Sequence, residues 1–456
     1  MQAGFDGAIR AMLPGDAAWP SDYAAEDVRY PSISWAVSMD AVYAIGPHTV
    51  DPRTGEIIDA NIMFSHQWVQ HWLSEFDLTA RTHATAAAAA AAAAEAEAAA
   101  APHTAATATT TTTAAAAAAA AATTTAAAAA GAGFRGGLAR VLRARQLELD
   151  ALLDGTGAAS GGHGGGGGGG MGHWAHAGRA HAGPCGHAHA RLGESAMLHA
   201  ALTWLDGEVG EDDDEVPPRY VEMAITEVTM HEVGHTLGLR HNFKASAAYS
   251  LQQLAQPAFV AQHGLTASVM DYAPPYLPAN RSLRHDYVYS HRVGEYDRWA
   301  IEYGYTPLPA EVPGQQHAEL KAIAARGAAR KALHFATDED GATTSGVDPY
   351  SNLFDLGDDP LAYYWDRMAL AQALLQQVLN HTVLSGEPWT RQLAAVSALM
   401  RIATRGGAYA AKYVGGYVFS KAHRGDPAAA EPVTPVDVAE QQRALQLVLQ
   451  VGQGKG

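Results

Sequence analysis

Residues 231–241 read HEVGHTLGLRH. His231 and His235 are four residues apart, so on a helix both imidazoles lie on one face, one turn apart, and can reach a single metal ion. Gly238 can adopt a positive φ angle, so the helix can end there and the chain can turn back. We therefore expect His241 to supply a third ligand to the same ion.

The helix that carries this pattern is predicted to run over about residues 217–239, where apolar residues recur at helical spacing. Pro217 and Pro218 suit its first turn, and Glu222 lies near the positive end of the helix dipole. The alternative is an amphipathic helix whose histidines merely lie at the surface. That reading explains neither Gly238 nor the third histidine.

Glu232 follows the first histidine directly, so it projects beside the metal rather than onto it. Three neutral histidines leave the double charge of zinc uncompensated, so the pKa of a bound water can fall from about 15.7 to about 7. A glutamate at that place can accept the water proton during attack on a peptide carbonyl and pass it to the leaving amine. The pattern predicts zinc-dependent peptide hydrolysis with Glu232 as the general base.

A second motif, SVMDY at residues 268–272, follows the histidines. Together the two motifs resemble the zinc signature and methionine turn of the metzincin clan of metalloproteases. The resemblance implies that Met270 forms an apolar floor beneath the three histidines. It also matches Tyr272 to a tyrosine that, in some members, approaches the metal and hydrogen-bonds the transition state. An ordinary core methionine is the alternative reading of Met270.

More of the chain resembles the bacterial-type zinc-dependent metalloproteases whose C-terminal part is called the Met-zincin domain. The segments that carry this likeness are DVRYPSISWAV, AIGPHTVDPRTGEIIDANI, MHEVGHTLGLRHNFKAS, SVMDYAP, VGEYDRWAIEYGY and YVGGYVFS. The resemblance implies a protein or peptide substrate and an extracellular location. It also implies that residues 57–64 are the edge strand of a sheet along the cleft, which would pair with an extended substrate. An edge strand without substrate is the alternative.

The chain departs from the family pattern in two ways. It begins roughly at the end of the first catalytic-domain helix, so the first strand of the sheet is expected to be missing. The start also lacks the layout of a signal peptide. Residues 81–190 form an Ala/Thr/Gly/His insertion that cannot offset chain entropy with unique packing and is expected to be disordered. A catalytically inactive metal- or peptide-binding remnant is therefore the alternative function.

The predicted fold class is α+β, a metzincin-like catalytic domain with a small mixed sheet and an active-site helix, plus a mostly helical C-terminal region. Residues 1–80 carry two predicted strands joined by turns. Residues 191–305 carry the helix, the zinc site and the methionine turn, and residues 306–456 form the helical extension. Within it, the acidic stretch 338–359 either offers carboxylates for calcium or is a solvated loop.

Composition excludes several other functions. The chain has 30 Lys+Arg against 47 Asp+Glu, a formal net charge of -17, and no basic cluster, so we expect no nucleic-acid partner. Its long alanine tract is interrupted by Thr and Glu and predicts no membrane span. The single cysteine, Cys185, excludes an intrachain disulfide and a multi-cysteine metal site, and leaves the compartment open.

Overall fold

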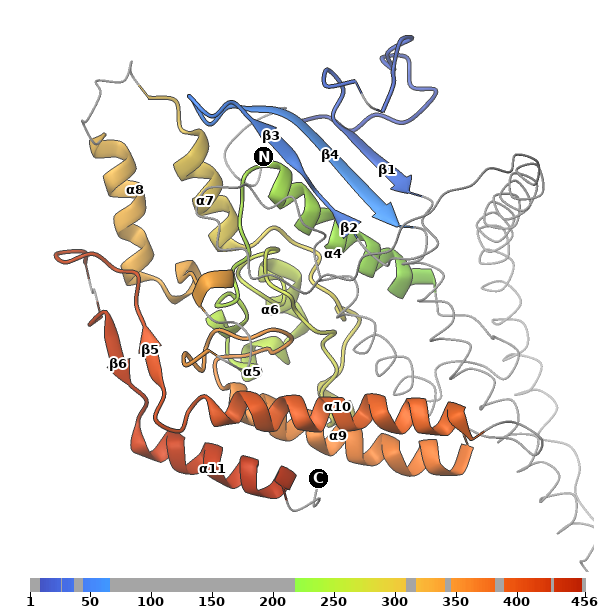
Figure 1. Cartoon of the computed structure of the whole chain (residues 1–456), viewed down its shortest axis with the longest axis vertical. Coiled ribbons are helices and arrows are strands. Elements are labelled where there is room, and N and C mark those ends of the chain that lie inside the picture. The colour runs from blue at the N-terminus through green and yellow to red at the C-terminus, as the bar shows by residue number, and fades with distance from the viewer. Residues whose placement is uncertain are drawn as a thin grey trace, which may run out of the picture. The chain divides into compact units, whose positions relative to one another are not determined.

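The computed structural model describes eight stretches of the chain. They are residues 9–25, 27–36, 44–65, 218–308, 317–340, 346–381, 389–427 and 430–452. The chain divides into two compact units, Met1–Ala91 with Ala180–Gly456 and, separately, Ala92–Arg179. Every described residue belongs to the first unit (Figure 1). The predicted insertion at 81–190, with Cys185, lies outside the described residues. The predicted division of the chain at residues 80, 190 and 305 stays a prediction.

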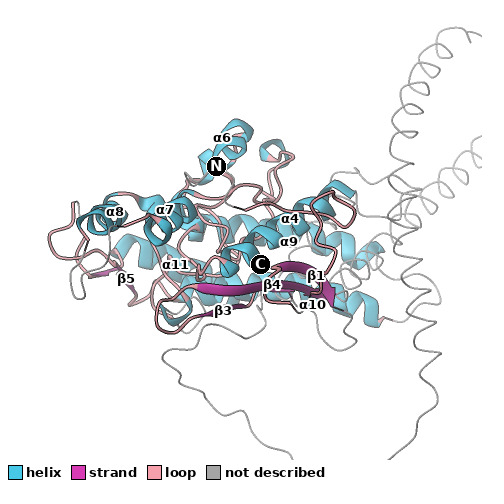
Figure 2. Cartoon of the chain, turned by 90° about the horizontal axis from the view of Figure 1, so that it is seen from above, coloured by secondary structure: helices cyan, strands magenta, loops and turns pink. Residues whose placement is uncertain are grey.

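A small mixed sheet is built on the long strand β4, Ile57–Ser65. Strand β1, Ser32–Ala36, pairs with it in parallel. On the other side, β2 (Ala44–Ile45) and β3 (His48–Val50) follow one another antiparallel to β4. Figure 2 shows β1, β3 and β4 together, with helices beside them. The two predicted strands and the turns between them are therefore present. The segment 44–50, between these strands in the sequence, also forms part of the sheet.

The prediction that residues 57–64 form an edge strand is wrong, because β4 lies between β1 and β2. Among the described strands, the side opposite β1 is formed by residues 44–50 instead. This segment is interrupted at Gly46-Pro47 and gives no run of alternating residues. Its sequence is typical of a turn, which is why it was not recognised as sheet.

Helix α4, Pro218–Thr236, packs beneath the sheet and is slightly shorter than predicted. Its Ala224 and Val228 are buried in one apolar cluster with Ile62 and Phe64 of β4. The helix ends as the sequence predicted, since Gly238 has a φ of +85°. The N–H of Gly238 donates to the carbonyl of His235 at 2.9 Å, and the N–H of Leu239 donates to that of Gly234 at 3.0 Å. These two bonds form a Schellman cap.

Beyond α4 the chain is mostly helical. The longer helices are α7 (Glu295–Tyr305), α8 (Ala318–Ala329), α9 (Pro360–His381), α10 (Thr390–Ala411) and α11 (Val438–Gly452), and two short ones are α5 (Leu251–Leu254) and α6 (Pro257–His263). A hairpin of β5 (Tyr417–Phe419) and β6 (Val433–Pro435) lies between α10 and α11. No helix in the described stretches is long and apolar enough to cross a membrane. The α+β class and the helical C-terminal region are confirmed.

The C-terminal helices pack directly onto the elements that carry the motifs. Leu370 and Leu374 of α9 have almost no exposed surface and belong to the same apolar cluster as Val228 of α4. Figure 1 shows α9 and α10 side by side, and α11 packs along α10. Burying a leucine side chain stabilises the fold by roughly 1.5–3 kcal/mol. The C-terminal region is thus part of the support of α4.

Candidate metal centre

Three histidine side chains converge at the end of α4. His231 and His235 come from the helix and His241 from the chain beyond Gly238, and each offers a ligand nitrogen within 4.8 Å of the others. The ring centroids are 4.7–5.3 Å apart. Within the described ranges this is the one group of three or more histidine, cysteine or acidic side chains close enough to hold a metal ion. The predicted ligands are therefore brought together.

The two histidines of α4 are oriented by backbone carbonyls. The ring nitrogen Nδ1 of His231 lies 2.8 Å from the carbonyl oxygen of Val269, and Nδ1 of His235 lies 3.0 Å from that of Leu239. A carbonyl oxygen only accepts, so each Nδ1–H must donate, and the lone pair is on Nε2. This is the tautomer that a metal ligand requires.

The third histidine is oriented by a carboxylate. Nδ1 of His241 lies 3.0 Å from Oδ1 and 3.1 Å from Oδ2 of Asp338, which is 97 residues further along the chain. The Tyr272 hydroxyl lies 3.1 Å from Nε2 of His241, to which it can donate. All three imidazoles therefore have the same pattern, with Nδ1 bound to an outer acceptor and Nε2 as the nitrogen that could bind zinc.

Glu232 directly follows His231 in α4 and has no solvent exposure. In the part of the chain that the structure describes, neither of its carboxylate oxygens has a hydrogen-bond partner. Burial raises the pKa of Glu232 to about 8, and the nearby Gly46 N–H offsets that only partly. Buried polar atoms are normally satisfied, so an orphaned carboxylate on the helix that carries two of the clustered imidazoles fits a cation and water bound at this place. The residues present therefore suit zinc.

Gly46 approaches the helix closely at this point. A β-carbon on Gly46 would overlap the backbone carbonyl oxygen of Glu232. Only glycine lets the interrupted strand 44–50 lie against α4 here. The sequence offered a Gly-Pro turn at this place and no sign of the contact, so this residue of the site was missed.

Met270 and Tyr272 both lie close to the histidine segment. Met270 is fully buried, and its sulfur lies against Gly234 of α4, between the two helical histidines in sequence. The Tyr272 ring centroid is 4.8 Å from that of His241 and 5.5 Å from that of His231. The apolar floor and the transition-state contact themselves stay predictions.

A buried aspartate that the sequence did not single out holds the segment 268–270, which carries Met270, in place. The carboxylate of Asp297, in the first turn of α7, accepts hydrogen bonds from the Ser268 hydroxyl, the Val269 N–H (2.9 Å) and the Gly294 N–H (2.7 Å). Burial raises the pKa of Asp297, and its hydrogen bonds oppose that rise. Because the carbonyl of Val269 accepts from His231, Asp297 indirectly positions the His231 ring.

The carboxylates that the sequence offered for calcium do not converge. Each lies against a different partner: Asp338 against His241, Asp340 against Lys421, Asp355 against Ser246 and Asn352, Asp358 against Lys331, and Asp359 against Arg443. No group of three described acidic residues could share one ion. The acidic stretch is thus a set of separate contacts, one of which reaches the histidine centre.

A family model described as Met-zincin matches residues 213–453, just over half of the 456 residues. The matched part contains all three histidines, Glu232 and the methionine turn. The comparisons with curated proteins and with solved structures gave no match.

Proposed function

The chain belongs to the Met-zincin family, and from that membership we propose that it is a zinc-dependent endopeptidase acting on proteins or peptides. The family is of a metallopeptidase type, and its fold implies zinc binding. The observation that carries the proposal is the cluster of three imidazoles whose ligand nitrogens lie within 4.8 Å of one another, together with the buried carboxylate of Glu232, which directly follows His231 in α4. A protein or peptide substrate and an extracellular location are parts of the same proposal and rest on the family resemblance.

In this proposal, His231, His235 and His241 hold the zinc ion. Zinc, when bound, acidifies water and stabilises negative charge on the carbonyl oxygen of the scissile peptide. The residues of the chain supply the geometry and the proton transfers. The outer acceptors Val269, Leu239 and Asp338 keep the three rings oriented, so little reorganisation is needed at the moment of reaction.

Glu232 is proposed as the group that moves the proton. It takes one proton from the attacking water as the new carbon–oxygen bond forms, and delivers it to the leaving nitrogen as the carbon–nitrogen bond breaks. Burial favours this exchange, because it raises the pKa of Glu232 to about 8 and brings it nearer to neutral pH. A cation next to the carboxylate lowers the pKa again and so opposes the effect of burial.

Tyr272 is proposed as a donor to the developing oxyanion. Its hydroxyl lies 3.1 Å from a ligand nitrogen, so it is close to the place where the substrate carbonyl would bind. The side chain is buried and packs against Phe243, which limits the positions that the hydroxyl can take. A fixed donor of this kind stabilises charge that appears only in the transition state.

The proposal is tested by metal analysis and proteolysis on the same preparation. Purified chain should contain zinc stoichiometrically and digest casein, and a chelator should abolish the digestion. Glu232→Gln should keep zinc and lose activity by a factor of about 100 or more. Glu222→Gln removes an exposed carboxylate from the same helix and should leave both unchanged. Undiminished digestion in Glu232→Gln would refute the general base, whereas bound zinc without any cleavage would favour the inactive remnant.

A further inference from the structure

His241 differs from the other two histidines in what holds it. It lies outside α4, in a stretch without regular secondary structure, so no helix fixes its position. Its outer acceptor is a charged carboxylate rather than a backbone carbonyl. That acceptor belongs to the acidic turn Asp338–Asp340, far away in the sequence.

We propose that Asp338 is a positioning residue for the metal ligand His241, and that the C-terminal hairpin β5–β6 holds the acidic turn in the place where Asp338 can act. The inference rests on the metal site proposed above. It assigns a role to residues outside both sequence motifs.

The first step is the contact itself. Both oxygens of Asp338 lie within 3.1 Å of Nδ1 of His241. An acceptor at Nδ1 fixes the tautomer and the ring orientation, and a negative charge makes the imidazole a stronger donor to a cation. The Thr337 hydroxyl lies 3.3 Å from Oδ2 of Asp338, so the carboxylate is oriented by its own neighbour.

The second step is the backbone that carries Asp338. The carbonyl of Ala336 accepts from the N–H of Phe243 at 2.8 Å. The side chain of Asn242, which is fully buried, accepts from the N–H of Ala336 at 3.3 Å and donates to the carbonyl of His334 at 3.0 Å. Residues 334–336 are therefore clamped to the residues directly after His241. His241 and Asp338 therefore lie next to two stretches of chain that are hydrogen-bonded to each other.

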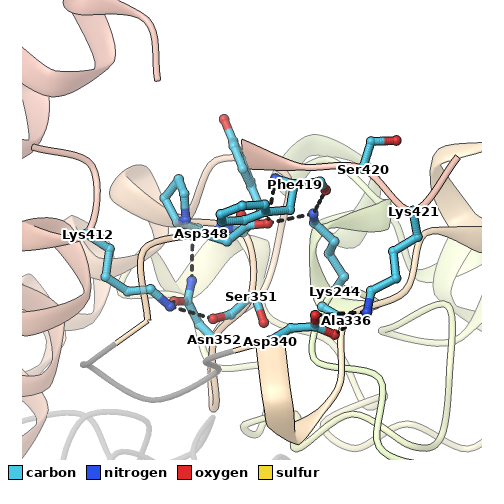
Figure 3. Close-up of polar contacts among 12 residues, drawn as sticks. Lys244, Ala336, Asp340, Asp348, Ser351, Asn352, Lys412, Phe419, Ser420 and Lys421 are labelled. Atoms are coloured by element: carbon cyan, nitrogen blue, oxygen red, sulfur yellow. Dashed lines mark hydrogen bonds and ion pairs between the residues drawn. The ribbon is translucent and has the colours of Figure 1, made fainter. Parts of the chain in front are cut away.

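The third step is the far side of the acidic turn. The ammonium group of Lys421 lies 2.8 Å from Oδ1 and 2.7 Å from Oδ2 of Asp340, and Asp340 in turn accepts from the N–H of Thr337 at 2.8 Å. Lys421 follows β5 of the hairpin, as Figure 3 shows. Its charge also lies over the ring of Phe335, 5.3 Å from the centroid. Lys421 thus contacts the last residue of the turn and an aromatic ring that precedes the turn in the chain.

The hairpin is itself tied back to the histidine segment. Lys244, three residues after His241, donates to the carbonyl of Phe419 at 2.6 Å and to Asp348 at 2.7 Å. Asp348 accepts from the N–H of Phe419 at 3.1 Å (Figure 3). Contacts of Phe419, at the end of β5, and of Lys421, just after it, therefore link the turn to the segment that follows His241.

The test is the zinc dissociation constant of the full chain, measured by competition with a chromogenic chelator. Asp338→Asn keeps the size of the side chain and loses its charge, and should weaken zinc binding by about 10- to 100-fold. Asp338→Glu should recover part of the loss. Lys421→Met should weaken binding in the same direction by a smaller factor, because the ion pair is partly exposed.

Asp358→Asn is the matched control. Its carboxylate is as exposed as that of Asp338 (39% against 40%), but it pairs with Lys331 at 3.4 Å and not with a histidine. This variant should bind zinc like the wild type. Zinc-free Asp338→Asn and Asp358→Asn should melt at the same temperature, which excludes a general loss of folding as the cause.

A second measurement reports the ligand geometry. The visible spectrum of the cobalt-substituted protein should change in Asp338→Asn and stay unchanged in Asp358→Asn. Wild-type zinc affinity and an unchanged cobalt spectrum in Asp338→Asn would overturn the inference while leaving the proposed peptidase intact. A wild-type chain that binds no zinc would overturn both.

Discussion

The sulfur of Met270 lies against Gly234 of α4, at a place where a β-carbon on the glycine would overlap it. Met270 has no exposed surface, so the methionine turn and the helix meet here without an intervening side chain or water. Gly234 lies between the two helical histidines, His231 and His235, in the motif itself. This contact sets the distance between α4 and the segment that carries Met270. That distance in turn sets the position of the histidine rings on the helix.

Gly234→Ala should therefore destabilise the protein. Alanine favours a helix over glycine by about 1 kcal/mol, but here the added methyl group must displace a buried methionine. Overpacking of this kind costs about 1–3 kcal/mol. We expect a net loss of free energy of unfolding in urea, together with weaker zinc binding because the helical histidines move.

Gly304 of α7 provides the matched substitution. It also lies within a helix, but nothing comes within 4 Å of a β-carbon built there. Gly304→Ala should be neutral or stabilise by up to about 1 kcal/mol. Equal changes in the free energy of unfolding of the two variants would show that the contact with Met270 does not restrict the size of the side chain at position 234.

The parts of the site that the sequence predicted depend on residues close together in the chain. The two helical ligands follow from a four-residue spacing, and the cap at Gly238 follows from the freedom of glycine to take a positive φ. The missed residues act over long separations. Asp338 reaches His241 across 97 positions and Asp297 reaches Val269 across 28, and no periodicity links such pairs.

The fold, like the site, could be predicted only where it depends on residues close together in the chain. The strands at 32–36 and 57–65 were recognisable because each is a continuous apolar or alternating run. Their pairing was not, since a parallel register depends on the chain between them and not on either strand. The edge position assigned to residues 57–64 failed for that reason: the partner on the second side is a two-residue strand next to a Gly-Pro turn.

Asp297→Ala should destabilise the fold by about 3 kcal/mol. The substitution leaves a hydroxyl and two buried N–H groups without their acceptor, and each buried unsatisfied group costs about 1–3 kcal/mol. Ser268→Ala removes one of these donors and should cost about 1 kcal/mol. Urea unfolding with and without zinc measures both; similar losses in the two variants would argue against Asp297 as the centre of the network.

The stability of the fold should depend on the buried carboxyl pair of Asp271 and Asp355. Burial, and secondly the charge of Asp355, raise the pKa of Asp271 well above its usual range, and burial also raises the pKa of Asp355. The folded state therefore holds protons that the unfolded chain releases near pH 4. The stabilisation is complete below that pH and is lost as the pH rises through the folded pKa values.

Asp271→Asn tests the predicted direction of this pH dependence. The amide cannot ionise, and its oxygen can still accept from the Ser246 N–H, as Oδ2 of Asp271 does at 2.7 Å. The free energy of unfolding of the variant, relative to the wild type, should thus increase from pH 5 to pH 8 in chelator-treated protein. A difference that stays constant over this range would mean that the carboxyl does not titrate with folding.

Removal of zinc should lower the melting temperature. A ligand present at 100 times its dissociation constant stabilises the folded state by about 2.7 kcal/mol, and a chelator removes that contribution. His241→Ala should melt at the same temperature with and without zinc. Calcium should not restore the loss, because the described acidic residues do not form a shared site. Recovery with calcium would point to a cation site other than the three histidines.

The buried ion pair between Lys244 and Asp348 should contribute more than any exposed pair of the C-terminal region. Their side chains are 7% and 2% exposed, and the ammonium group lies 2.7 Å from Oδ2. Lys244→Met leaves a buried carboxylate without its cation and should cost about 3–5 kcal/mol. The double variant Lys244→Met/Asp348→Asn should lose less than the sum of the two single losses, because neither charge is then left alone.

A double-mutant cycle in urea measures this coupling, with Arg443 and Asp359 as the comparison. That pair is 40% and 37% exposed, and its coupling should be about 0–1 kcal/mol. For Lys244 and Asp348 we expect about 1–3 kcal/mol, the range for contacting residues in one network. Since Lys244 also donates to Phe419 of β5, its loss should loosen the hairpin that holds the acidic turn. Equal coupling in the two pairs would mean that burial gives Lys244 no special part in that support.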